Sequence, residues 1–85
     1  MLMPEDIQAR LRERPFRPFR IIASEGLRFD IRHPNLVFVG RRDLMLGFTN
    51  VEGSSIYDRV TRLALIQIVA LEELESPAAS GNGQA

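Results

Sequence analysis

The feature that most constrains the fold is a regular alternation of apolar and polar side chains on both sides of Glu25-Gly26. The apolar members of the alternation are Phe19, Ile21, Ala23, Leu27, Phe29 and Ile31. A period of two places these side chains on one face of a β-strand pair, and a Gly-containing dipeptide between two such runs is typical of a tight hairpin turn. The sequence therefore predicts an antiparallel hairpin with one face in the core.

The alternation is interrupted downstream at "HPN", residues 33–35. Pro34 has no N–H to donate to a strand ladder, which predicts a bulge or sharp bend before the strand resumes at "LVFV". A second turn is expected at residues 40–43, leading into "LMLGFT", where Gly47 indicates a further bend or a close approach of two backbone segments. The sheet is therefore expected to curve strongly.

The remaining chain is assigned by the same criteria. Residues 50–58, "NVEGSSIYD", are predicted to be the longest loop, followed by a strand at about 59–63. The segment "IQIVALEEL", residues 66–74, is either a last strand or a short helix, and its β-branched residues favour the strand. At the other end, Pro4 and the acidic residues after it predict a helix over about 4–14, with Met3, Ile7 and Leu11 forming one apolar stripe.

The segment "RPFRPFRII", residues 14–22, repeats Pro-Phe-Arg between that helix and the first strand. Two prolines three residues apart favour polyproline II, which puts Phe16 and Phe19 on one face and Arg14, Arg17 and Arg20 on another. One interpretation is a binding device, either an arginine ladder for phosphates or a proline-rich ligand. The other, which the alternation from Phe19 onward favours, is a stiff link whose phenylalanines fill the core.

These elements predict a mainly β fold with one N-terminal helix: a small antiparallel barrel of about five strands, of the Sm-like or SH3-like kind, with the helix across one open end. Residues 1–75 are expected to form this single domain, and residues 76–85 a disordered tail. The expected core consists of Met3, Ile7, Leu11, Phe16, Phe19, Ile21, Leu27, Phe29, Ile31, Val37, Val39 and Leu46.

Two resemblances rest on these segments. The run from "LRER" through a strand to Glu25-Gly26-Leu27, followed by a bent meander, resembles Sm and Hfq-type proteins, which implies a barrel, oligomerisation and RNA binding. Leu63-Ala64-Leu65 stands where the Hfq pattern has a Lys-His pair. The chain also resembles small bacterial proteins that carry "RPFRPFRI", a glycine-containing hairpin, "IRHP" and a "VGRR" turn, a resemblance that implies no activity.

Catalysis and metal binding find little support in the residue types. The 85 residues include no cysteine and no lysine, and His33 is the single histidine. A nucleophile-and-base pair would have to combine His33 with Asp30 or Ser24, and Asp30 with His33 gives two metal ligands where three are wanted. We therefore expect no enzyme activity, no catalytic residue, no bound metal and no cofactor. The chain start and the absence of a long apolar run predict a cytoplasmic protein without a membrane partner.

Charge is balanced overall but unevenly distributed. Residues 10–42 carry nine arginines against three acidic residues, and residues 43–85 carry two arginines against six. Two classes of function follow: a non-enzymatic interaction or assembly module that associates with itself or another protein, and a nucleic-acid (RNA) binding protein with an arginine-rich face. The zero net charge favours the first. Candidate nucleic-acid or anion contacts are Arg17, Arg20, Arg28, Arg32, Arg41 and Arg42, with Tyr57 or a phenylalanine for stacking.

Overall fold

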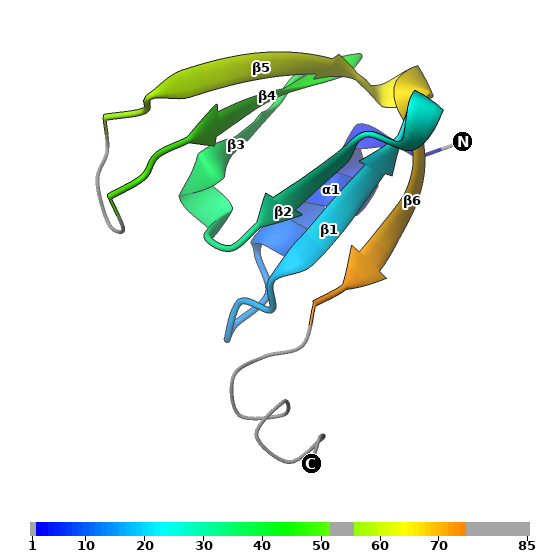
Figure 1. The fold of residues 1–85 in the computed structure, drawn as a ribbon. Coiled ribbons are helices and arrows are strands. Elements are labelled where there is room, and N and C mark those ends of the chain that lie inside the picture. The colour runs from blue at the N-terminus through cyan, green and yellow to red at the C-terminus, as the bar shows by residue number, and fades with distance from the viewer. Residues whose placement is uncertain (1, 52–55, 75–85) are drawn as a thin grey trace, which may run out of the picture.

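A computed structural model of the chain describes residues 2–51 and 56–74, whose helix and strands are shown in Figure 1. In chain order the elements are α1 (Pro4–Leu11), β1 (Phe19–Ala23), the 3-10 turn η1 (Ser24–Gly26), β2 (Arg28–Ile31), η2 (Pro34–Leu36), β3 (Val37–Val39), β4 (Asp43–Phe48), β5 (Arg59–Ala64), η3 (Leu65–Gln67) and β6 (Ile68–Glu73). The expected loop at 50–58 is described only at its two ends, and the expected tail at 76–85 lies outside the described residues.

The described strands form two antiparallel sheets of three strands each, in the orders β2-β1-β6 and β3-β4-β5. The predicted five-stranded barrel is therefore wrong: neither sheet closes, and there are six strands among residues 2–51 and 56–74. The bend expected at "HPN" is a complete break, because Pro34 opens the 3-10 turn η2 and has no N–H for a ladder. The chain passes between the sheets at η2 and again at η3 (Figure 1).

Helix α1 begins where predicted but ends three residues early, at Leu11 instead of residue 14. Its start is stabilised by Pro4 at the first helical position and by the Met3 N–H, which donates to Oδ2 of Asp6 at 2.8 Å. Its end follows from Pro15, which has no N–H for the Leu11 carbonyl and whose ring would collide with that carbonyl in a continued helix. The side chain of Arg14 donates to the Leu11 oxygen instead, at 3.4 Å.

The core lies between the sheets and α1, and it consists of Ile7, Phe19, Ile21, Ala23, Ile31, Val37, Leu44, Leu46, Leu63 and Leu65. Six of the twelve expected core residues are in this set: Ile7, Phe19, Ile21, Ile31, Val37 and Leu46. Leu11, Phe16, Phe29 and Val39 are partly buried against it. Two expectations are wrong, because Met3 is 51% exposed in extended backbone before the helix and Leu27 is 55% exposed in the turn, outside the β1–β2 pairing.

The hairpin at Glu25-Gly26 is confirmed: both residues have positive φ, 65° and 78°, and β1 pairs with β2 on either side of the turn. The last segment forms the predicted strand, β6. At Gly47 the close neighbour is a side chain and not the backbone segment expected, because a methyl group there would lie 2.8 Å from Cδ2 of the Tyr57 ring. The Tyr57 hydroxyl donates to the carbonyl oxygen of Asn35 in η2 at 2.7 Å.

Candidate functional site

Three of the six candidate arginines, Arg17, Arg20 and Arg32, are held in ion pairs with carboxylates. Arg28, Arg41 and Arg42 have no carboxylate partner among residues 2–51 and 56–74. Arg17 follows α1, Arg20 belongs to β1, and Arg28 belongs to β2. Arg32 comes directly after β2, and Arg41 and Arg42 lie in the turn between β3 and β4. The free cations are thus divided between β2 and a turn of the other sheet.

The central ion pair of the β2-β1-β6 sheet joins Arg20 to carboxylates on both neighbouring strands. Arg20 Nε donates to Oδ1 of Asp30 at 2.7 Å, and its Nη1 lies 3.5 Å from Oε1 of Glu72. The hydrogen bond from Arg20 lowers the pKa of Asp30, and the same bond raises the pKa of Arg20. Arg32 adds a second cation 3.6 Å from Asp30. These groups neutralise one another and connect side chains on all three strands of the sheet.

A second group of ion pairs fixes α1 and the Pro-Phe-Arg repeat. Glu13 accepts hydrogen bonds from Arg17, which lower the pKa of Glu13 and raise that of Arg17. Arg10 reaches Glu73 of β6 at 2.9 Å and lies over the ring of Phe19, 4.6 Å from its centroid. The repeat therefore links helix and sheet: Phe19 is fully buried and its ring meets that of Phe16 edge to face.

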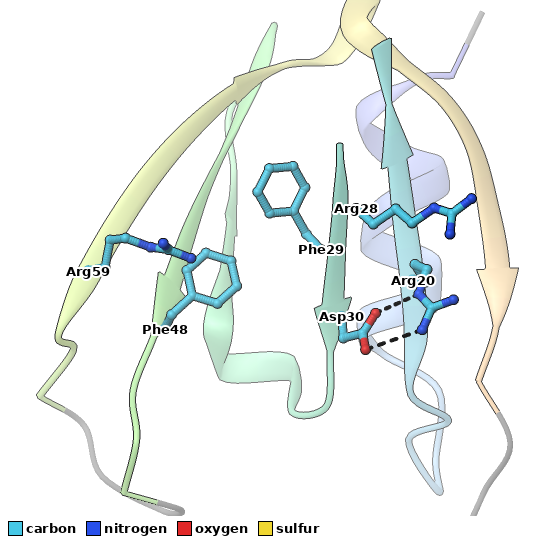
Figure 2. A pocket seen from close by; sticks show the side chains of 6 residues that line it. All are labelled: Arg20, Arg28, Phe29, Asp30, Phe48 and Arg59. Carbon is cyan, nitrogen blue, oxygen red and sulfur yellow. Dashed lines mark hydrogen bonds and ion pairs between the residues drawn. The ribbon is translucent and has the colours of Figure 1, made fainter. Parts of the chain in front are cut away.

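The candidate site is a cleft of about 470 Å³ between the two sheets, shown in Figure 2. Its lining comes from β1 and β2 on one side and from β4 and β5 on the other, and it consists of Arg20, Arg28, Phe29, Asp30, Phe48 and Arg59. The rings of Phe29 and Phe48 stack with centroids 6.0 Å apart, and the guanidinium of Arg59 lies 4.9 Å from the Phe48 centroid. The cleft therefore combines aromatic surface with cationic groups.

Sequence reasoning placed Arg20 and Arg28 among candidate contacts but did not assign Phe48 or Arg59 to a site, and it assigned Phe29 to the core. Phe48 is the last residue of β4 and Arg59 the first of β5, and the two are register partners across the hairpin. The signal in the sequence is their position on either side of the predicted loop, because residues that flank a hairpin loop face each other across the two strands. Their meeting with Phe29 depends on how the two sheets pack.

The other candidates do not assemble into a site. Among residues 2–51 and 56–74, no group of three or more His, Cys, Asp and Glu side chains lies close enough to hold a metal ion. The carboxylates at the end of β6, Glu72 and Glu73, pair with Arg20 and Arg10. No helix among the described residues is long and apolar enough to cross a membrane.

No protein-family model, curated protein or solved structure matches the chain. Membership of the bacterial family with the "RPFRPFRI" pattern, and the relation to Sm and Hfq-type proteins, stay predictions.

Proposed function

We propose that the chain is a non-enzymatic assembly module that associates with itself by pairing β5 of one copy with β6 of the next. The observation that carries this proposal is that β5 and β6 are both end strands of six residues. Within the described part of the chain, each is hydrogen-bonded to a neighbouring strand along one edge only. A free edge presents N–H and C=O groups that a second strand can satisfy.

Apolar side chains on the two end strands support the same contact. Val60 of β5 is 56% exposed and Val69 of β6 is 64% exposed. Val69 also borders an apolar hollow of about 410 Å³, whose other lining residues are Leu2, Ile68 and Ala70. A strand from a second copy would remove these surfaces from water, at about 25 cal/mol per Å² of apolar area. A domain of this size has a small core of its own, so such burial adds materially to its stability.

The charges on the two strands favour an antiparallel contact between β5 and β6. β5 begins with Arg59 and also carries Arg62, whereas β6 ends with Glu72 and Glu73. Antiparallel pairing between copies places the first residues of β5 beside the last residues of β6, so Arg59 lies beside the carboxylates at the end of the neighbouring strand. Since the two edges differ, the interface is heterologous: each copy uses its β5 edge for one neighbour and its β6 edge for another.

The two other end strands are less suited to this role. β2 has four residues and β3 has three, and the short turn η2 joins them at the corner between the sheets. Short edge strands are one of the ways in which proteins limit pairing with other chains. The longer β5 and β6 edges are therefore the surfaces assigned to assembly.

The test is light scattering coupled to size exclusion at micromolar concentration. The full chain is expected to elute as an oligomer, and Val60→Glu and Val69→Glu are each expected to weaken association by about tenfold or more, because they place a charge in a contact that excludes water. Both side chains are exposed in the single chain, so its free energy of unfolding should change little.

Phe38→Glu is the matched control, because Phe38 is 64% exposed but belongs to β3. It should leave the oligomer intact. A strictly monomeric wild-type chain would refute the proposal, and equal loss of the oligomer in all three variants would refute the assignment to β5 and β6.

A further inference from the structure

We infer that the cleft between the sheets binds a planar aromatic ligand that carries one phosphate or carboxylate group, the chemistry of a nucleotide unit. The inference rests on the six residues of the cleft and does not depend on self-association. Its volume of about 470 Å³ falls within the range of small-molecule sites, roughly 300–1,000 Å³.

The aromatic half of this recognition comes from Phe29 and Phe48. Both side chains are only partly buried, and both contribute ring surface to the cleft (Figure 2). They come from different sheets, β2 and β4, and meet in a stacked arrangement with an interplanar angle of 30°. A planar ring can extend such a stack, and stacking on an aromatic side chain contributes about 1–3 kcal/mol per base in nucleic-acid complexes.

The anionic half comes from Arg28 and Arg59. Neither has a carboxylate partner among residues 2–51 and 56–74, and both line the cleft from exposed strand positions. Arg59 lies beside the rings, whereas Arg28 leaves β2 on the face opposite to Phe29 (Figure 2). The guanidinium of Arg59 is held beside the stack by its contact with Phe48, 4.9 Å from the ring centroid. A guanidinium binds phosphate and carboxylate through two parallel hydrogen bonds, so each arginine offers a complete anion contact.

The remaining two lining residues, Arg20 and Asp30, favour an anion over a cation. Asp30 is the one carboxylate of the cleft lining, and Arg20 at 2.7 Å and Arg32 at 3.6 Å already neutralise it. The three arginines of the lining therefore exceed its acidic charge by two. A cationic ligand would have to displace Arg20 from Asp30, whereas Arg28 and Arg59 have no carboxylate within residues 2–51 and 56–74 of the single chain that an anion would have to displace.

The experiment is a ¹H–¹⁵N NMR titration of the full chain with three probes: adenosine 5′-monophosphate, adenosine and ribose 5-phosphate. The first carries ring and phosphate, and each of the others carries one of the two. We expect the monophosphate to bind at least about tenfold more tightly than either part, with shifts confined to the cleft residues. Equal binding of the monophosphate and ribose 5-phosphate, or no binding of the monophosphate at 10 mM, would overturn the inference.

Variants locate the site. Arg28→Gln is expected to weaken monophosphate binding by about tenfold, as for the loss of one charge-assisted contact. Arg41→Gln is the matched control, because it removes an exposed arginine outside the cleft, and binding should be unchanged. Phe48→Leu should abolish the preference for the monophosphate over ribose 5-phosphate. An equal effect of Arg28→Gln and Arg41→Gln would show a general charge effect and overturn the site.

A fourth probe separates the two sources of such a ligand. A single-stranded oligoadenylate that perturbs the same residues with higher affinity than the monophosphate identifies the ligand as part of a strand. Equal or weaker binding of the oligonucleotide identifies it as a free small molecule. Val69→Glu, which tests assembly on β6, changes no residue of the cleft, so oligomeric state and ligand affinity are measured independently and failure of one proposal is distinguishable from failure of the other.

Discussion

The two sheets can be compared through one row of side chains in each. In the β2-β1-β6 sheet, Asp30, Arg20 and Glu72 are register partners, and the row is a chain of ion pairs. The β3-β4-β5 sheet has the corresponding row Phe38, Met45 and Arg62. There Phe38 is 64% exposed and the Arg62 side chain is 69% exposed.

The two sheets differ in whether the side chains of these rows are paired with one another. Arg20 saturates the first row, because its two neighbours are carboxylates that accept its hydrogen bonds. The second row leaves an aromatic ring and a cation facing water, and the only carboxylate beside Arg62 in the described residues is Asp43 at 3.6 Å. Saturated groups maintain a fold, whereas exposed rings and cations are the groups that contact other molecules. The comparison therefore shows that the outer row of the first sheet is paired within the chain, whereas that of the second sheet is largely exposed.

The largest expected effect contrasts one phenylalanine from each sheet. Phe19→Ala empties a fully buried position and is expected to cost about 3–5 kcal/mol of unfolding free energy. Phe38→Ala trims an exposed side chain and is expected to change stability by less than about 0.5 kcal/mol. Urea unfolding followed by far-ultraviolet circular dichroism measures both. Similar losses would show that Phe38 is packed as tightly as Phe19 and would remove the contrast.

An intermediate effect is expected from two glycines. Gly47→Ala in β4 puts a methyl group 2.8 Å from the Tyr57 ring, so the sheet or the ring must shift, at about 1–3 kcal/mol. Gly26→Ala in the hairpin of the first sheet has no atom within 4 Å of its added methyl and is strained only by its φ of 78°, at about 1 kcal/mol. Thermal unfolding of both variants checks this order, and a larger loss at Gly26 would contradict it.

The smallest expected effect concerns the ion-pair row. Because Arg20 lowers the pKa of Asp30 in the folded chain, the stabilisation from Asp30 is complete above its unfolded pKa, about 3.9, and is lost as the pH falls through the lower folded value. The stability gap between wild type and Asp30→Asn should therefore be largest at neutral pH and should shrink below about pH 4.

Urea midpoints at neutral and acidic pH measure that gap. Phe38→Ala provides the reference from the other sheet, since it removes no titratable group and its gap to wild type should not vary with pH. A gap for Asp30→Asn that stays constant on acidification would show that the first row does not depend on the charge of Asp30.

Local patterns predicted the parts of the fold that depend on neighbours in sequence. The hairpin at Glu25-Gly26 follows from backbone freedom, and the burial of Phe19 follows from the alternation. The separation into two sheets did not, because Pro34 indicates an interruption but not whether the strand bends or ends. Leu44 was also left out of the expected core, although it is fully buried on the same face of β4 as Leu46.

The candidate site was less predictable than the fold. Charge alone selected Arg17, Arg20 and Arg32, but carboxylates on other elements engage them in the folded chain. The cleft depends on Phe29 and Phe48, which are 19 positions apart and belong to different sheets. No periodicity reports a contact of that kind, since it is fixed by the packing of one sheet on the other.

The position of Tyr57 makes the joint between the sheets directly observable. It is the only tyrosine, and the chain has no tryptophan. Its ring lies against Gly47 of β4 and its hydroxyl donates to Asn35 at the corner between β2 and β3. Excitation of the native chain therefore yields emission that originates at this one joint, so a change in the relative placement of the two sheets can be followed by tyrosine fluorescence without attaching a label.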